Sequence, residues 1–292
     1  MIIWLASYPK SGNTWVRIFL SYIINSQNVE EINDEILKKI RNYPLLNHDF
    51  SKELKEKFTD KINTNDENYI KKKFFKNWIT SQQKLNLNNK INILKTHNML
   101  CKIGEHKFTD LENTIAAIHI VRDPRNVLTS VKNHYSKENY EEAKNFLVDD
   151  YRWIGTDNNI IEDIPTFIGS WKTHFLSWKR FPKNYILIKY EDLLINPNET
   201  FGKIVDHIKQ FIELDVDEKK IEKAIKVVSF ENLKKLEQKE IFKESIKDKK
   251  TGQLKKFFYL GPKNDWRNIL NKNISDEISK RFELEMKELG YI

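Results

Sequence analysis

The sequence contains a single cysteine, Cys101, among its 292 residues. One cysteine excludes an intrachain disulfide framework and a multi-cysteine metal site, and it favours a reducing compartment. No apolar run approaches the roughly 20 residues that a membrane-spanning helix requires. Residues 1–7 have the pattern of a core strand and lack the basic start of a signal peptide. We therefore expect a cytoplasmic protein without a membrane span.

Internal repeats and Gly/Ser-rich linkers are also absent, so we expect a single domain that spans residues 1–292. Residues 25–90 are polar and rich in lysine, and they predict a helical insertion. Residues 240–256 predict a flexible basic loop, and residues 136–165 predict another irregular segment. No group of His, Cys, Asp or Glu residues has metal-ligand spacing, so we expect no required metal.

Acidic residues are fewer than basic ones: 42 Asp and Glu against 50 Lys and Arg give a formal net charge of +8 and a pI near 9.1. A positive field favours anionic ligands, which include nucleotides, nucleic acids and acidic membranes, but it does not choose among them. The basic residues are dispersed among the acidic ones, and no known RNA- or DNA-binding motif is present. We therefore expect no nucleic-acid partner, although a non-catalytic basic nucleic-acid-binding protein stays an alternative.

Four short apolar runs predict buried strands, and helical patterns lie between them. The predicted strands are residues 1–6, 91–96, 115–121 and 185–190. Their alternation with helices predicts an α/β fold with a central parallel sheet flanked by helices on both faces. Ligands of such sheets bind at the carboxyl ends of the strands. All four predicted strands are followed by polar residues, at 7–14, 95–97, 122 and 190–192.

The first predicted strand leads directly into the segment YPKSGNTW, residues 8–15. Pro9 and Gly12 permit a tight turn whose backbone N–H groups converge on an anion, and the helix that follows directs its N-terminal dipole to the same point. Lys10 adds a mobile positive charge. Further donors are Ser11, Asn13 and Thr14. The segment predicts a phosphate-binding loop, with an ordinary strand-turn-helix connection and a surface lysine as the alternative.

A second anion site is predicted at RDPRNVLTS, residues 122–130. Asp123 suits the N-cap of a helix and Pro124 its first position. Ser130 then lies about two turns into this helix, and Arg122 stands at its start. An arginine fork and a hydroxyl with this spacing can close on one phosphate. The alternative is a helix-capping arginine with a solvent-facing serine.

The segments YPKSGNTW and RDPRNVLTS together resemble the two nucleotide-binding signatures of the cytosolic-type sulfotransferases. These enzymes use 3'-phosphoadenosine-5'-phosphosulfate, PAPS, and release PAP. Further similar segments occur in the family's order at residues 95–97, 169–178, 190–192, 229–230 and 264–268. The resemblance implies a P-loop NTPase-like sulfotransferase fold. It also implies in-line transfer of a sulfuryl group from PAPS to a hydroxyl or amine of a small-molecule acceptor.

In this family the first signature holds the 5'-phosphosulfate and the second holds the 3'-phosphate. The resemblance therefore implies a cofactor site made of Lys10, Ser11, Gly12, Asn13, Thr14, Trp15, Arg122, Ser130, Tyr190, Ser229, Phe230 and Gly261. Trp15 and Phe230 would cover the two faces of the adenine. Simple core packing is the alternative for both rings.

Residues 95–97 are similar to the family segment that carries the catalytic histidine, and His97 is the candidate general base. Lys10 is the candidate for stabilising the leaving phosphate as negative charge develops there. Lys95 lies two residues before His97 on an extended strand, hence on the same face, and can share this role. The alternatives are a histidine that caps a strand end and a solvated lysine. His119, inside a predicted strand, is expected to be a hydrogen-bonded core residue.

The sequence departs from the family pattern at two places. The family's C-terminal signature has an Arg-Lys-Gly triplet just before a Gly-Asp-Trp, and the cations of the triplet bind the 3'-phosphate. This chain has YLG at residues 259–261. Either PAPS binds more weakly, or other cations replace the lost charge: Lys255, Lys256 or Lys263. A Thr-Val pair that serves dimerisation in the family is not visible in residues 269–277. The oligomeric state therefore stays open between monomer and homodimer.

A P-loop kinase or NTPase is the closest alternative. Its loop requires a Gly-Lys-Ser/Thr order after a glycine-led turn, whereas this chain has KSG at residues 10–12 and no glycine before Lys10. The strand at 185–190 is followed by acids and superficially resembles a magnesium-binding strand end. A kinase would depend on that metal, so turnover without magnesium separates the two classes.

Overall fold

The computed structural model describes residues 1–25, 32–43, 74–155, 165–239, 242, 252 and 255–292. Parts of the predicted insertion at 25–90 and most of the predicted basic loop at 240–256 therefore lie outside the described residues. The chain divides into two compact units, each assembled from three separate stretches. They are Met1–Tyr8, Arg41–His119 and Asp150–Leu187 for the first, and Pro9–Ile40, Ile120–Asp149 and Ile188–Ile292 for the second. A single domain over residues 1–292 stays a prediction.

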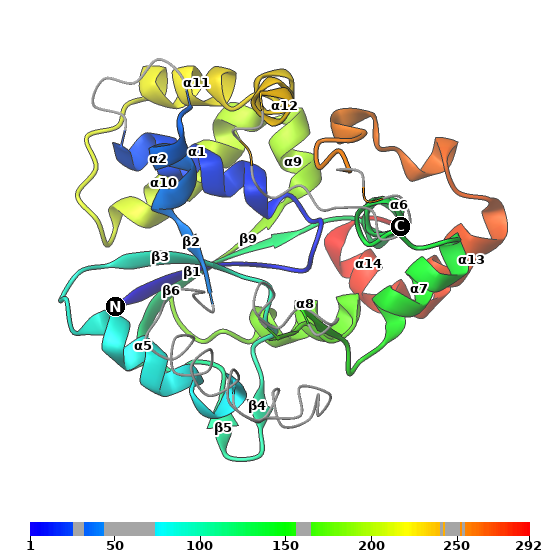
Figure 1. Cartoon of the computed structure of the whole chain (residues 1–292), viewed down its shortest axis with the longest axis horizontal. Helices are drawn as coiled ribbons and strands as arrows, with labels where there is room; N and C mark the ends of the chain where they lie inside the picture. Colours follow the sequence, from blue (N-terminus) through cyan, green and yellow to red (C-terminus); the bar gives the residue numbers. More distant parts are fainter. Residues whose placement is uncertain (26–31, 44–73, 156–164, 240–241, 243–251, 253–254) are drawn as a thin grey trace. The chain divides into compact units, whose positions relative to one another are not determined.

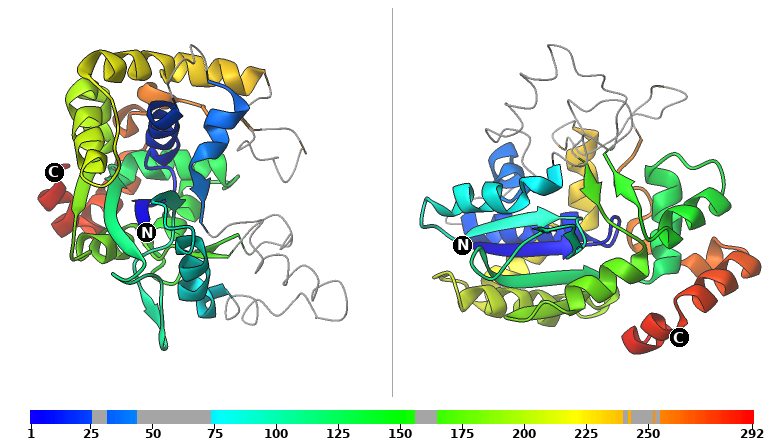
Figure 2. Two further views of the ribbon diagram at one scale, coloured as in Figure 1. Left: turned by 90° about the vertical axis from the view of Figure 1, so that its left-hand side faces the viewer. Right: turned by 90° about the horizontal axis from the view of Figure 1, so that it is seen from below.

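A five-stranded sheet has the strand order β2-β3-β1-β6-β9 (Figure 1). Its strands are β1 (Ile2–Ser7), β2 (Arg41–Asn42), β3 (Asn92–Thr96), β6 (Thr114–Val121) and β9 (Tyr185–Lys189). β3 pairs in parallel with both β1 and β2. Helices flank the sheet (Figures 1 and 2), and the predicted α/β fold with a central parallel sheet is confirmed. Sequence patterns do not predict β2, because two residues are too few to show a periodicity.

The strand β1 is buried along its whole length, and its side chains do not alternate between apolar and polar. This continuous apolar pattern is typical of a parallel strand that is covered on both faces. In the register with β3, Leu5 is opposite Lys95 and Ala6 is opposite Thr96. The carboxyl ends of these two strands therefore lie side by side, and Ser7 is next to the segment that begins with His97.

Short hairpins and helices complete the part of the first unit that the structure describes. They are α5 (Trp78–Asn86), the antiparallel pair β4 (Lys102–Ile103) and β5 (His106–Lys107), the antiparallel pair β7 (Trp153–Ile154) and β8 (Thr166–Phe167), and α8 (Trp171–Lys179). α8 begins with a capping box, because the Ser170 hydroxyl accepts from the Thr173 backbone N–H and the Thr173 hydroxyl accepts from the Ser170 N–H.

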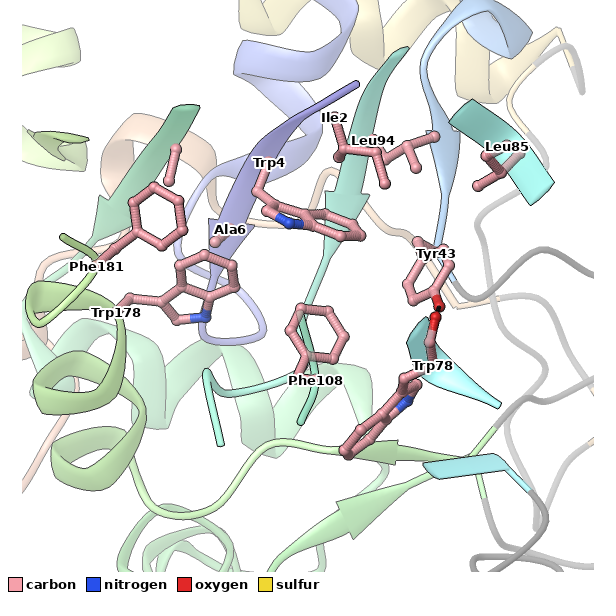
Figure 3. Close-up of a cluster of buried hydrophobic side chains, with 11 residues drawn as sticks. Ile2, Trp4, Ala6, Tyr43, Trp78, Leu85, Leu94, Phe108, Trp178 and Phe181 are labelled. Atoms are coloured by element: carbon pink, nitrogen blue, oxygen red, sulfur yellow. Dashed lines mark hydrogen bonds between the residues drawn. The ribbon is translucent and has the colours of Figure 1, made fainter. Parts of the chain in front are cut away.

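The core of the first unit is built around Trp4 (Figure 3). The Trp4 ring packs against Phe108 with centroids 5.2 Å apart, and its Nε1 donates to Thr114 Oγ1 at 2.9 Å. Trp178 of α8 belongs to the same cluster, and its Nε1 donates to the carbonyl oxygen of Asn98 at 2.9 Å. Asn98 follows His97 directly, so the packing of α8 fixes the main chain beside the candidate base.

The second unit is mostly helical. Its elements are α1 (Asn13–Asn25), α2 (Asp34–Lys39), α6 (Pro124–His134), α7 (Tyr140–Val148), α9 (Tyr190–Ile195), α10 (Pro197–Lys209), α11 (Glu218–Val227), α12 (Phe230–Gln238), the 3-10 turns η1 (Gly261–Lys263) and η2 (Trp266–Asn268), α13 (Lys272–Arg281) and α14 (Glu283–Leu289). α6 begins as predicted, with Asp123 as the N-cap that accepts from the Arg125 N–H and Pro124 in the first turn.

α1 is buried on nearly all sides, and its buried residues include polar ones. The reason is visible at Arg17, a polar residue of this helix. Its guanidinium donates to the carbonyl oxygens of Leu37 and Ile40 at 3.2 and 3.3 Å. The end of α2 therefore covers the side of α1 on which Arg17 lies.

Candidate functional site

The segment between β1 and α1 contains a tight turn in the second unit, and residues 10–14 are here named the anion loop. Lys10 and Gly12 both have left-handed backbones, with φ of +66° and +98°. Turns of this kind can direct successive N–H groups to one side, and the first N–H groups of α1 have no acceptor within the helix. Ser11 is buried, and its hydroxyl has no hydrogen-bond partner in the described part of the chain. The loop therefore presents hydrogen-bond donors of the kind that bind a phosphate group.

Tyr190, the first residue of α9, packs directly on the anion loop. A Cβ atom at Gly12 would overlap the Tyr190 ring, so only glycine fits at this position. The guanidinium carbon of Arg122 lies 4.1 Å from the centroid of the same ring. One aromatic side chain therefore contacts residues of both predicted anion sites.

Arg122 joins the two predicted anion sites through hydrogen bonds. Its Nη1 donates to the Lys10 carbonyl oxygen at 3.1 Å and lies 3.5 Å from Ser130 Oγ. The Ser130 hydroxyl is held by these contacts and is not a purely solvent-facing group. The second unit thus brings together five of the predicted residues: Lys10, Gly12, Arg122, Ser130 and Tyr190.

Asn264 is a residue of this cluster that sequence reasoning missed. Its side-chain amide donates to Ser130 Oγ at 3.0 Å and to the Asn126 carbonyl oxygen at 2.9 Å, and its Oδ1 accepts from Thr129 Oγ1 at 2.6 Å. The sequence signal is an asparagine where the family's Gly-Asp-Trp signature has its glycine. The contact itself joins residues more than 130 positions apart, and no local pattern indicates it.

The predicted adenine-contacting residues lie in two aromatic groups of the second unit. Phe230 packs on Gly261, whose left-handed backbone has φ of +54° and where a Cβ atom would overlap the Phe230 ring. Ser229 caps α12, since its hydroxyl accepts from the backbone N–H of Asn232. Trp15 instead makes edge contacts with Tyr190 and with Phe201, and the latter belongs to the core.

Phe257 is a second contact that sequence reasoning missed. The Lys10 ammonium lies 3.9 Å from the centroid of the Phe257 ring, within the range of a cation–π interaction. The contact directs the Lys10 side chain toward residues 257–258, which also pack on Phe242. Lys10 is therefore an oriented cation and not a free surface lysine.

His97 and Lys95 belong to the first unit. The carbonyl oxygen of Ser7 accepts from His97 Nδ1 at 2.7 Å. Because a carbonyl oxygen can only accept, this bond assigns the ring proton to Nδ1 and leaves a lone pair on Nε2 in the neutral imidazole. Lys95 is only 8% exposed, so the alternative of a solvated lysine is wrong.

Two further histidines, His119 and His174, are fully buried in the first unit. Their ring centroids are 5.7 Å apart, and His119 Nδ1 is 2.9 Å from the Tyr185 hydroxyl. The prediction of His119 as a core residue is confirmed, but only one nitrogen is paired, since Nε2 has no partner among the described residues. His174 also packs edge-on against Tyr8, with centroids 5.7 Å apart.

Burial dominates the electrostatics of this histidine pair. It lowers the pKa of His174 to about 3, and the nearby backbone of His97 offsets part of this effect. Burial also lowers the pKa of His119 well below its usual value, and the adjacent His174 adds to the shift. Both imidazoles are therefore neutral at physiological pH.

A buried ion pair holds the start of α6. Arg125 donates to both carboxylate oxygens of Asp123, at 3.0 Å from Nε and 2.7 Å from Nη2, and its guanidinium carbon lies 3.9 Å from the Trp266 ring centroid. The backbone N–H of Asp123 donates to Glu191 Oε1 at 3.1 Å, and the Tyr291 hydroxyl donates to Glu191 Oε2 at 2.9 Å. Burial raises the pKa of Glu191. These contacts fix the position of Asp123, which directly follows Arg122.

Gly12→Ala is expected to lower the free energy of unfolding by about 1 to 3 kcal/mol, the usual cost of a strained backbone, because the new methyl group meets the Tyr190 ring at a left-handed position. Gly202→Ala in α10 is the matched control. It meets no atom within 4 Å and is expected to be neutral or to stabilise by up to about 1 kcal/mol. Urea denaturation of both variants measures the difference, and equal stabilities would contradict the close packing of Tyr190 on the loop.

No group of three or more His, Cys, Asp or Glu residues lies where it could hold a metal ion within the ranges that the structure describes. In the same ranges, every helix is too short or too polar to cross a membrane.

The sequence matches the family model of the sulfotransferase domain over residues 2–290. The chain therefore belongs to the sulfotransferase family, as its motifs predicted, and it is an enzyme of this class.

Two relatives and one solved structure illustrate the match. The chain is 24% identical over 302 residues to flavonol 3-sulfotransferase of Flaveria bidentis, covering 99% of this chain and 83% of the relative. It is 22% identical over 293 residues to cytosolic sulfotransferase 16 of Arabidopsis thaliana, covering 99% and 77%. A structure of retinol dehydratase in a complex with retinol and PAP matches with a TM-score of 0.59 and 18% identity, covering 98% of this chain and 81% of that one. The structural match shows a shared fold.

Proposed function

We propose that this chain transfers a sulfuryl group from PAPS to a hydroxyl or amine of a small-molecule acceptor. The observation that carries the proposal is the contact of Arg122 with both Lys10 and Ser130, one residue from each predicted anion site, in the second unit. PAPS has a phosphosulfate on its 5' side and a phosphate on its 3' side, so its binding requires two anion sites near each other. The retinol dehydratase complex, whose fold this chain shares, contains PAP.

The residues of the cluster fit such a ligand. The buried Ser11 hydroxyl, which has no partner in the described ranges, and the glycine-restricted turn at Gly12 are features of a loop that surrounds an anion. We assign the 5' end of the cofactor to Lys10, Ser11, Gly12, Asn13 and Thr14. We assign the 3'-phosphate to Arg122 and Ser130, and the adenine side to Trp15, Tyr190, Ser229, Phe230 and Gly261. When bound, PAPS supplies the sulfuryl group and the phosphate that leaves with PAP.

His97 is the proposed general base. With the ring proton on Nδ1, its Nε2 accepts the proton of the acceptor hydroxyl while the acceptor oxygen bonds to sulfur. The bond between sulfur and the phosphate oxygen breaks in the same displacement, and negative charge develops on that oxygen. Lys10 and Lys95 are the proposed cations that stabilise this charge.

The names of relatives support a small, hydroxyl-bearing acceptor and a cytosolic location. One relative is named for flavonol, and the matched dehydratase structure contains retinol. Two relatives from Arabidopsis thaliana are named cytosolic sulfotransferases. We extend these properties to this chain as part of the proposal, and we propose no metal requirement.

Incubation with radiolabelled PAPS and a panel of phenols, alcohols, amines and sugars tests the proposal. We expect label to move to at least one acceptor, and the rate to be unchanged in EDTA. Phosphoryl transfer from ATP that stops in EDTA would instead support the kinase alternative. Salt-dependent binding of oligonucleotides with no binding of PAP would support the nucleic-acid alternative.

A further inference from the structure

The segment before Asp265 differs from the sulfotransferase signature at two neighbouring points. Tyr259 and Leu260 stand where the signature has its Arg-Lys pair, and Tyr259 is 55% exposed. Asn264 stands where the signature has a glycine. The chain has therefore lost two cations and gained one amide within six residues.

The amide of Asn264 has a fixed orientation. The residue is only 7% exposed, and its Nδ2 donates to the Asn126 carbonyl oxygen at 2.9 Å. A carbonyl oxygen can only accept, so this bond identifies the nitrogen end of the amide. The same nitrogen faces Ser130 Oγ at 3.0 Å, and Asn264 therefore donates to the Ser130 hydroxyl.

The Ser130 hydroxyl is consequently oriented to donate its proton in a hydrogen bond. Its oxygen accepts from Asn264 Nδ2 at 3.0 Å and, more weakly, from Arg122 Nη1 at 3.5 Å. A hydroxyl has two lone pairs and one proton, so occupied lone pairs leave the proton for a third group. In the described ranges the structure records no acceptor for this proton. An anionic oxygen beside the Arg122 guanidinium is the complementary acceptor.

Lys255 brings a cation to the same helix. Its Nζ donates to the carbonyl oxygen of Asn133 at 3.2 Å. Asn133 is three residues after Ser130 on α6, so this carbonyl lies about one helical turn further along the same helix. Lys255 is half-buried, whereas Lys256 and Lys263 are exposed. Of these three lysines, Lys255 is the one whose ammonium has a recorded contact with α6.

We propose that Lys255 and Asn264 together replace the missing Arg-Lys pair in binding the 3'-phosphate of PAPS. Lys255 supplies the positive charge. Asn264 is a positioning residue, because it acts through the Ser130 hydroxyl. This inference rests on the proposed function, since it assumes that the ligand carries a 3'-phosphate.

Calorimetric titration of two ligands tests the inference without turnover. PAP carries the 3'-phosphate, and adenosine 5'-phosphate lacks it. Asn264→Ala and Lys255→Ala are each expected to weaken PAP binding by about tenfold or more, the worth of one hydrogen bond to a charged group. Neither variant should change the affinity for adenosine 5'-phosphate. A general structural defect would weaken both ligands alike, so the ratio of the two affinities isolates the 3'-phosphate contact.

The control is Lys280→Ala, which removes an exposed charge of the same unit on α13 and should leave the ratio unchanged. Restoring the family's cations as Tyr259→Arg/Leu260→Lys in the Lys255→Ala background should recover PAP binding. Should Asn264→Ala fail to fold, Asn264→Gly supplies the residue of the family signature and serves the same comparison.

Three results would overturn different conclusions. If the wild type binds PAP no more tightly than adenosine 5'-phosphate, the proposed function itself fails. If the wild type prefers PAP and the Lys255 and Asn264 variants keep that preference, only this inference is wrong. A loss of preference in Lys256→Ala or Lys263→Ala, with Lys255→Ala unchanged, would also refute the assignment of Lys255.

Discussion

Replacing His97 with alanine is expected to lower sulfuryl transfer by a factor of about 10² to 10⁴, the usual contribution of a positioned general base. Binding of PAP is expected to stay unchanged, because the candidate cofactor residues belong to the second unit and His97 belongs to the first. The rate constant kcat with a good acceptor measures the first effect, and calorimetric titration with PAP measures the second.

A second variant distinguishes the loss of the general base from the loss of the hydrogen bond that His97 makes to Ser7. His97→Asn keeps a side-chain N–H that can donate to the Ser7 carbonyl oxygen, but its amide nitrogen has no basic lone pair. We expect it to fold like the wild type and to be as inactive as His97→Ala. His106→Ala, at a half-buried histidine of β5 in the same unit, is the matched control and should keep full activity. Transfer that survives both His97 substitutions would assign the base to another group.

The strands were predictable from the sequence where burial on both faces produced a continuous apolar run. β1, β3 and β6 match their predicted ranges to within about one residue at each end. β9 ends one residue earlier than predicted, because Tyr190 already begins α9. The prediction of a buried strand is wrong for β9, in which only Ile188 is buried. The two-residue strands of the hairpins were not predictable, since their pairing depends on tertiary contacts and not on a periodic pattern.

The same distinction holds for the candidate site. The anion loop and the start of α6 are local structures, in which a turn, a cap and a helix N-terminus follow each other along the chain. Sequence motifs therefore indicated Lys10, Gly12 and Arg122. Asn264 and Phe257 enter the site from segments more than 120 residues away from the groups they touch, and only the folded chain reveals these contacts.

Acidification from pH 6.5 to pH 5 is expected to lower the free energy of unfolding by about 2 kcal/mol through His174 alone. Burial lowers the pKa of His174 to about 3, whereas imidazole in an unfolded chain titrates near 6.5. Between these values the unfolded state binds a proton that the folded state does not. The contribution of the neutral ring to stability is therefore complete above pH 6.5, and it is lost progressively as the pH falls toward 3.

His119 contributes with the same sign, because burial and the neighbouring His174 also lower its pKa. The two rings are adjacent, so their protonation is coupled and each charge opposes the other. Charging either ring would require water or a new partner inside a core that also contains Phe175 and Trp178. Acid is therefore expected to destabilise the first unit, which contains the proposed base, before the second unit.

Urea denaturation at pH 7.5, 6.5 and 5 measures the effect against matched variants. His174→Leu removes the buried titrating group, and between pH 6.5 and pH 5 it should lose about 2 kcal/mol less stability than the wild type. His119→Phe tests the second ring in the same way, and it provides the comparison if His174→Leu folds poorly. Gly202→Ala removes no titrating group and should keep the wild-type pH dependence. If protonation of the buried pair drives unfolding, removing either ring must weaken the dependence of the free energy of unfolding on pH. Equal losses of stability with acid in the wild type and in both core variants would therefore show that the buried pair does not limit stability at low pH.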